Sequence, residues 1–335
     1  MTDAPQVLPP LRTWSHLADN KRRPSEYEVV SVKLHYHTAN PNAAWEIDPD
    51  AFMNRWYRQH REGSAVTHPD WDQYRDPDAL VYRTYVALQD DQETYVAAML
   101  DEHDRIGHDS ALSADWVGAL ARWYTPSRYP AHLLQMATAY VGQMAPASTI
   151  TTPCYFQAAD EMRVVQHTAY RTRELANRFT GVGLAEAERA RWQDDPVWQG
   201  FRQLLERLLV TWDWAEAFVV LNLVAKPAHD EALLSVLGAT ADAHGDRVLR
   251  YLADSHLADA QRSRRWSEAL LAMMLAVPGN GAVIGRWVEH WVPLADEAID
   301  TYVADLPGTA PGAAAGAGGS AKAALATWRH QLGLP

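Results

Sequence analysis

Three polar residues interrupt the apolar stripes of predicted helices: Gln92, Glu161 and Glu216. Glutamates that face one another across a helical bundle are the ligands of four-helix di-iron proteins. These proteins take one Glu from each of two helices and a Glu-x-x-His pair from each of the other two. The three-residue spacing places both ligands on one face of a helix, within reach of the same metal pair. The presence of Glu-x-x-His therefore decides whether such a site can form.

The Glu-x-x-His motif is absent, because none of the 42 acidic residues is followed three positions later by a histidine. Glu161 and Glu216 then have plainer interpretations. Glu216 would be an acid at the edge of its stripe that pairs with an arginine of a neighbouring helix, since buried charges are usually paired. Glu161, next to Asp160, would belong to a solvated acidic edge. An unconventional metal site stays open as the alternative for both.

Other groups of reactive side chains are weaker candidates. His35 and His37 would share one side of a strand, but two imidazoles without a third ligand make a poor metal site. Residues 101–104 (Asp-Glu-His-Asp) with nearby His108 could form an acidic metal patch, although a solvated helix end is the commoner role. Cys154 has no basic neighbour in the sequence that would activate it, which favours a core thiol.

Helical periodicity dominates from residue 76 onward. Asp76-Pro77 is a helix-start signal, and apolar residues then recur at steps of four and three from Val81 to Met99. Long antiparallel helices favour a bundle, so the sequence predicts an all-α protein. Beyond the first helix we expect helices over about 113–124, 130–144, 153–178 and 196–225, the last one ended by Lys226-Pro227, and two or three more between 228 and 305.

The two ends of the chain differ from this helical body, which we place at residues 76–306. Residues 1–75 are broken by seven prolines and have no sustained period, yet they are rich in Trp and Tyr. We therefore expect a long N-terminal extended arm that lies on another surface, its own body or a partner's. One short strand is predicted at 27–34. Residues 307–335 contain a run of glycine and alanine that predicts a flexible C-terminal tail.

Composition narrows the range of functions. The chain has 335 residues and a formal net charge of −12, which argues against a nucleic-acid or anionic-membrane partner. The longest apolar run, Ala269 to Val277, is too short to cross a membrane. A single cysteine and the lack of an apolar leader fit the cytoplasm. The chain has 14 Trp and 14 Tyr but only 5 Phe, and this split suggests large interfaces because both side chains carry a polar tip.

Eight segments, taken together, resemble one family. The pattern resembles the β (small) subunit of the hydroxylase component of bacterial multicomponent di-iron monooxygenases, the group that includes toluene, phenol and alkene monooxygenases. The likeness is colinear over residues 11–303, and no single short motif carries it. The segments are LRTWSHL at 11–17, RPSEYEV at 23–29, LHY at 34–36, LVYRT at 80–84, QMAPAST at 143–149, HTAYRT at 167–172, DWAEAFVVLNL at 213–223 and RWS at 265–267.

The resemblance implies a ferritin-like helical bundle whose di-iron ligands have been lost. In this family the α subunit holds the di-iron centre, whereas the β subunit keeps the fold only. Glu161 matches the Glu of the α subunit's Asp-Glu-x-Arg-His motif, and Val164 stands in the place of its histidine. In the second such motif Ser255 and Ala258 would replace Glu and His. Glu216 matches the lone Glu of the third ligand helix.

The resemblance also implies a non-catalytic structural subunit with no cofactor of its own and with the di-iron centre in its α partner. Two copies each of α, β and γ would form a hetero-hexamer that inserts one atom of O2 into an aromatic or alkene hydrocarbon. Electrons would come from NADH through a reductase and a ferredoxin, and an effector protein would bind transiently. Trp14, Tyr27, Tyr36 and Trp45 would anchor the arm to a partner subunit. Two other functions stay open, a stand-alone ferritin-like metalloprotein and a helical binding module.

Overall fold

The computed structural model describes residues 16–17, 22–35, 50–307 and 313–335. Every regular element in these ranges is helical. The helices are α1 (Glu26–Ser31), α2 (Phe52–Tyr57), α3 (Tyr82–Arg105), α4 (Ala114–Ala119), α5 (Arg128–Met144), α6 (Ser148–Arg178), α7 (Glu188–Asp194), α8 (Pro196–Leu208), α9 (Trp214–Val220), α10 (Lys226–His229), α11 (Leu237–Ala243), α12 (Arg247–Leu275), α13 (Asn280–Val303) and α14 (Ala313–Gln331).

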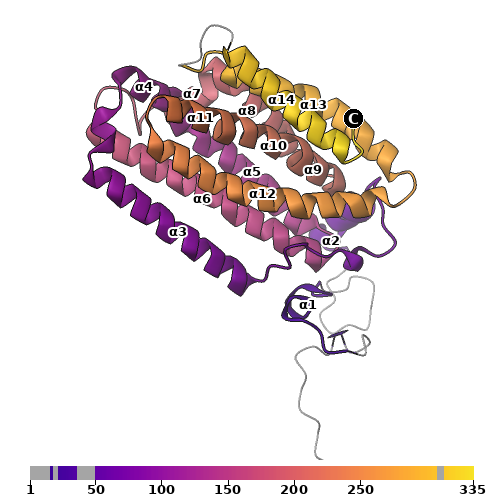
Figure 1. The fold of residues 1–335 in the computed structure, drawn as a ribbon. Coiled ribbons are helices and arrows are strands. Elements are labelled where there is room, and N and C mark those ends of the chain that lie inside the picture. Colours follow the sequence, from indigo (N-terminus) through magenta and orange to yellow (C-terminus); the bar gives the residue numbers. More distant parts are fainter. Residues whose placement is uncertain (1–15, 18–21, 36–49, 308–312) are drawn as a thin grey trace, which may run out of the picture.

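The long helices pack side by side around one large apolar core (Figure 1). Helix α5 packs on α6, α8 packs on α13, and α12 packs on α6. Helices α3 and α14 lie on opposite sides of this bundle in Figure 1. The outlying α3 is held partly by a small apolar cluster of its own, formed by Val96 and Met99 with Val248 and Leu252 of α12. Most of its remaining inward contacts are polar, which is unusual for a helix of 24 residues.

Tryptophans build much of the core. Seven of them expose 6% or less of their surface, namely Trp116, Trp123, Trp192, Trp198, Trp214, Trp266 and Trp291. The indole N–H groups of five of them donate to internal acceptors. For example, Trp116 donates to an Asp246 carboxylate oxygen at 3.1 Å, and Trp266 donates to the Gln157 side chain at 3.0 Å. The excess of Trp, which we expected at interfaces with partners, thus serves largely the interior of the chain itself.

The predicted strand at 27–34 is wrong, because its first part forms α1. A capping box starts this helix: the Glu28 N–H donates to Ser25 Oγ at 3.2 Å, and the Ser25 N–H donates to the Glu28 carboxylate at 2.8 Å. The segment then lies on the body of its own chain, where the Leu34 N–H donates to Ser148 Oγ at 2.9 Å. The valine-rich sequence, which is typical of strands, was the misleading signal, and the reciprocal Ser25–Glu28 cap outweighs it.

The helix predicted over 196–225 is two helices. Helix α8 ends before Leu209, and α9 begins after Asp213, whose carboxylate accepts the backbone N–H groups of Ala215 and Glu216 at 2.9 and 3.1 Å. Trp212, placed by periodicity in the apolar stripe, lies between the two helices and is 40% exposed. A strong N-cap therefore breaks a pattern that is otherwise continuous.

Lys226-Pro227 does not end the second helix, contrary to our prediction. The helical path continues through α10 and a π-helical segment, η8 (Asp230–Val236), into α11. Another π-helical segment, η7 (Leu221–Ala225), comes just before the proline. Because a π turn shifts the hydrogen-bonding register, the missing N–H of Pro227 is tolerated there.

The predicted flexible tail is largely the helix α14. Alanine is the best helix former, and Ala321 and Leu325 are buried against the bundle. Glycine at 318 lets α14 approach α13, since a Cβ at that position would lie 2.8 Å from Val303 Cγ2. The Ala-Gly composition therefore marks close packing between helices here, in place of the predicted flexible tail.

Across the described ranges, none of the helices combines the length and the apolarity that crossing a bilayer requires.

Candidate functional site

Buried charged side chains gather around the middle of α6. Asp160, Glu161, Arg163 and His167 each expose 8% or less of their surface. The first three belong to two clusters, and His167 contacts Glu93 of the first. The α3 cluster consists of Tyr85, Gln89, Glu93, Asp160, Arg163, Asp259 and Arg262, and the Lys226 cluster consists of Glu161, Lys226, His229 and Asp230.

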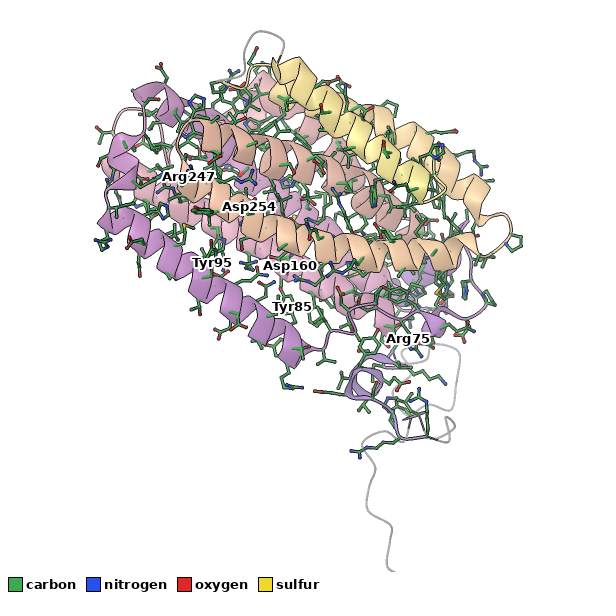
Figure 2. The ribbon with its side chains drawn as sticks, in the orientation of Figure 1. Arg75, Tyr85, Tyr95, Asp160, Arg247 and Asp254 are labelled. Carbon is green, nitrogen blue, oxygen red and sulfur yellow. The ribbon has the colours of Figure 1, made fainter. Side chains whose placement is uncertain are left out.

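The α3 cluster joins α3, α6 and α12 through two carboxylates. The Tyr85 hydroxyl donates to Asp160 at 2.8 Å, and Gln89 Nε2 donates to both Asp160 and Asp259, at 2.9 and 3.0 Å (Figure 2). Arg262 bridges the same two carboxylates, at 2.6 and 2.9 Å. Burial and then repulsion from Asp259 raise the pKa of Asp160 to about 7, against the attraction of Arg262. These bonds hold α3 on the bundle.

Arg163 extends the α3 cluster toward the surface. Its guanidinium pairs with Asp259 inside the protein and with Glu93 of α3, at 2.6 Å, at the rim. The other oxygen of Glu93 contacts His167 Nε2 at 3.1 Å, and His167 Nδ1 lies 3.3 Å from His256 Nε2. Burial lowers the pKa of both histidines, most strongly that of His256. Both rings are therefore neutral at neutral pH.

The Lys226 cluster places an ammonium group between two carboxylates. Lys226 Nζ lies 2.7 Å from Glu161 Oε1 and 3.1 Å from Asp230, and all three side chains are at least 92% buried. Burial works to raise the pKa of Asp230, but Lys226 and His229 outweigh it and hold that pKa at about 2. Burial raises the pKa of Glu161. It also opposes the charge on Lys226, yet attraction to both carboxylates raises the lysine pKa.

The residues present do not fit a di-iron centre. The cation that neutralises Glu161 is the side chain of Lys226, so the glutamate already has its counter-charge. No acidic residue is followed three positions later by a histidine, so the Glu-x-x-His pair is absent. Throughout the described ranges, no group of three or more His, Cys, Asp or Glu side chains is placed to hold a metal ion. The chemistry that the site can perform is charge pairing and hydrogen bonding.

The structure corrects the expected setting of Glu161. The residue is 1% exposed and its neighbour Asp160 is 4% exposed, so the pair is no solvated acidic edge. Each acid has its own buried cation, Arg262 for Asp160 and Lys226 for Glu161. Val164, one helical turn on from Glu161, is buried and lines a small cavity.

The other three expected ligand positions do not surround Glu161. Glu216 accepts the Trp291 indole N–H at 3.1 Å and, contrary to our prediction, pairs with no arginine among the described residues. Ser255 is at the edge of α12, where it donates to Gln92 at 3.4 Å, and Ala258 is exposed. In this stretch of α12 the buried residues are His256 and, one turn later, Asp259 and Ala260. Ser255 and Ala258 are therefore not among the residues that α12 buries in the bundle.

The predicted interface residues are only partly described. Trp14, Tyr36 and Trp45 lie outside the described residues. Tyr27 is 8% exposed within the chain, and its hydroxyl accepts the Asp76 N–H at 3.0 Å. Tyr27 is therefore a contact inside the chain, which corrects its expected place at a subunit interface.

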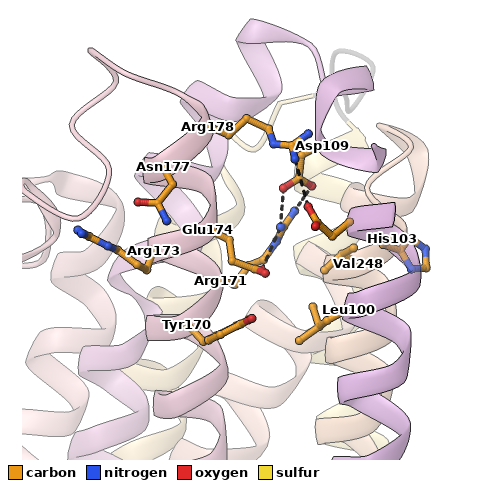
Figure 3. Close-up of a pocket in the computed structure, with 11 residues that line it drawn as sticks. Leu100, His103, Asp109, Tyr170, Arg171, Arg173, Glu174, Asn177, Arg178 and Val248 are labelled. Carbon is orange, nitrogen blue, oxygen red and sulfur yellow. Dashed lines mark hydrogen bonds and ion pairs between the residues drawn. The ribbon is translucent and has the colours of Figure 1, made fainter. Parts of the chain in front are cut away.

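A groove lies beside the acidic run, and Asp104 and Asp109 are part of its lining. The groove has a volume of about 580 Å³ between the end of α3 and α6 (Figure 3). Arg171 of α6 pairs there with Asp109, at 2.5 Å, and His108 bonds the same carboxylate at 2.9 Å. Since basic side chains already pair with these acids, the groove offers no acidic metal patch.

The remaining two sequence candidates also have ordinary partners. His35 Nε2 lies 3.1 Å from Thr151 Oγ1, and His37 is outside the described residues. Cys154 is fully buried, and burial raises the pKa of its thiol well above the usual range. Cys154 is the core thiol that the sequence predicts.

Sequence reasoning missed the cations that complete both clusters. Lys226 and Asp230 are four residues apart, and Asp259 and Arg262 are three apart, so each pair shares a helix face. Opposite charges at that spacing on an otherwise apolar face were the available signal. Their partners on α6 could not be inferred from spacing, because they lie about 65 and 100 residues away in the chain.

Comparison with known proteins shows the family to which the chain belongs. A family model described as Methane/Phenol/Alkene Hydroxylase matches residues 51–278. The chain belongs to this hydroxylase family. One member, the hydroxylase component subunit beta of the toluene-4-monooxygenase system of Ectopseudomonas mendocina, is 50% identical over 297 residues, which cover 89% of this chain and 91% of that protein.

A more distant hydroxylase relative and a solved structure support the same family. The phenol 2-monooxygenase oxygenase component DmpL of Pseudomonas sp. (strain CF600) is 26% identical over 287 residues, 83% of each chain. A structure of toluene 4-monooxygenase with toluene bound in the resting active site superposes with a TM-score of 0.84 at 49% identity, over 90% of this chain and 99% of that one. The predicted family and the predicted helical-bundle fold are confirmed.

The Lys226 cluster generates a stability prediction. Lys226→Met removes the ammonium and leaves two buried carboxylates without a cation, so we expect a loss of about 3–5 kcal/mol in the free energy of unfolding. Urea unfolding of the purified protein measures it. Lys322→Met is the matched control, since its pair with Asp300 is partly exposed and such pairs contribute about 0–1 kcal/mol. Equal losses in the two variants would contradict the account.

Proposed function

We propose that this chain is the non-catalytic β subunit of a di-iron monooxygenase hydroxylase. The ion pair of Lys226 with Glu161 is the observation that carries the proposal. Glu161 matches an iron-ligand position of the catalytic subunits by resemblance, and here its counter-charge is an ammonium group. The β subunit of toluene-4-monooxygenase, at 50% identity, is the relative that supports the same role.

The role of the chain is mechanical. It supplies a rigid bundle against which an α subunit packs, so that the α helices that bear the iron ligands keep their positions. With α and γ chains, two of each, it forms a cytoplasmic hydroxylase that adds one oxygen atom from O2 to an aromatic or alkene hydrocarbon. NADH-derived electrons reach the α subunit through reductase and ferredoxin, and an effector protein binds transiently.

The surface of α3 and α6 supports a large contact with a partner. Four tyrosines there are between 45% and 76% exposed, namely Tyr82, Tyr95, Tyr155 and Tyr170. Tyrosine is enriched in protein interfaces because its ring is apolar and its hydroxyl can form hydrogen bonds. The stand-alone metalloprotein is not favoured, because its proposed ligands Glu161 and Glu216 are occupied by different internal partners.

Iron partition tests the proposed function. The hydroxylase is purified by a tag on this chain, its iron is measured, and the subunits are then separated and measured again. We expect iron in the complex and in the separated large subunit, and none above background with this chain. Iron that stays with this chain in stoichiometric amount would favour the metalloprotein, and a monomer with no oxygenase partner would favour a binding module.

The arm generates a second prediction. Trp14→Ala combined with Trp45→Ala is expected to weaken assembly, since large aromatic anchors contribute most to interface stability. Co-purification of the large subunit with the tagged chain measures it. Tyr27→Ala is the contrasting variant: because Tyr27 is buried inside the chain, it should lower the thermal stability of the chain itself. Unchanged recovery of the large subunit with the double variant would contradict the anchoring role.

A further inference from the structure

A small cavity lies inside the bundle between α6, α12 and η8. Its free volume is about 20 Å³, and one water needs about 10–15 Å³. Polar groups form part of its lining, namely Tyr124, Ser127, Thr168, His229 and His256. The cavity is therefore large enough and polar enough for one water molecule.

Two histidines of this lining each have one nitrogen without a hydrogen-bond partner. His229 is 1% exposed and His256 is 6% exposed. The unpartnered atoms are His229 Nε2 and His256 Nδ1. Buried polar atoms are almost always satisfied, by protein groups or by ordered water. Two such atoms on one cavity indicate that something bonds both.

The contacts of His256 show that its free nitrogen is an acceptor. At the surface end, Arg163 and His167 outweigh burial and lower the pKa of Glu93, so this carboxylate is an acceptor and His167 Nε2 carries a proton. His167 is neutral, and its Nδ1 then accepts the Nε2–H of His256 at 3.3 Å. His256 is neutral too, so its Nδ1 has no proton.

His229 reaches the cavity from the other side. Asp230 is an ionised carboxylate that also pairs with Lys226, so it accepts the Nδ1–H of His229 at 3.3 Å. This bond leaves His229 Nε2 for the cavity. Two unpartnered nitrogens, His256 Nδ1 and His229 Nε2, thus belong to the lining of one cavity.

We propose that the cavity is a specific site for one water molecule that donates a hydrogen to His256 Nδ1 and forms a second hydrogen bond with His229 Nε2. Water is the small molecule that fits, because it can both donate and accept, and its oxygen can also accept from the hydroxyl of Ser127 or Thr168.

The water joins the two charged clusters into one hydrogen-bonded chain. This chain runs from Glu93, which is 48% exposed, through His167 and His256 to the water, and from there through His229 and Asp230 to Lys226, whose ammonium group forms an ion pair with Glu161. Other charged groups that act on it include Arg163 on α6 and Asp259 and Arg264 on α12. The interior of the bundle is thereby connected to a carboxylate at the surface of α3.

A crystal structure of the purified hydroxylase tests the site directly. We expect one peak within hydrogen-bonding distance of both His229 Nε2 and His256 Nδ1, with no anomalous signal of a metal. An empty cavity would overturn the proposal, as would a metal ion or a direct bond between the two rings.

A double-mutant cycle gives an independent measurement in the same complex. His229→Leu and His256→Leu should each lower the Tm of the hydroxylase, because each leaves the water with only one histidine partner. The double variant should lose less than the sum of the two shifts, because the bridge is already broken by either single substitution. Strictly additive shifts would show that the rings do not share a water and would also overturn the proposal.

Discussion

The Lys226 ammonium, held between Glu161 and Asp230, is the contact on which the middle of the bundle depends. Carboxylates in an apolar interior are costly unless a cation compensates them. In a metalloprotein that cation is the metal, and in this chain it is a side chain from α10. Because the lysine belongs to the chain, the helices are held together whether or not any ion is available, which suits the supporting role that we propose.

The same logic explains how α3 is attached. A peripheral helix usually docks through an apolar stripe, but α3 adds the polar contacts of Tyr85, Gln89 and Glu93 to its small apolar cluster with α12. Asp160 and Asp259, which are the partners of Tyr85 and Gln89, are in turn fixed by arginines. A polar contact of this kind is directional, so it sets the position of α3 and of the exposed tyrosines that it carries. The internal charges and the proposed subunit contact are thus linked through one helix.

Periodicity predicts the long helices of this chain well, because apolar residues at steps of three and four have to be buried on one side. It fails where a local group overrides the pattern. The Asp213 cap divides one predicted helix, and the π-helical segment before Pro227 carries another past an expected stop. The cap and the π-helical segment each depend on a few atoms, so neither composition nor an apolar stripe reveals them.

Only part of the candidate site could be predicted from the sequence. The missing Glu-x-x-His spacing and the unexpected acid Glu161 could be found by inspection. The partner of that acid could not, since Lys226 lies 65 positions away and its spacing from Asp230 does not show which segment packs against it. The neighbourhood of Ser255 shows a related difficulty: Ser255 is half-buried while the adjacent His256 is buried, so an alignment without a structure does not decide which of the two faces the bundle.

The central claim is that an ammonium group replaces metal in this subunit. Anomalous diffraction from crystals of the assembled hydroxylase, collected at the iron absorption edge, tests it most directly. The account predicts strong iron peaks in the large subunit and, in this chain, ordinary density for Lys226 between Glu161 and Asp230 without an anomalous peak. An iron peak beside Glu161 of this chain would contradict it.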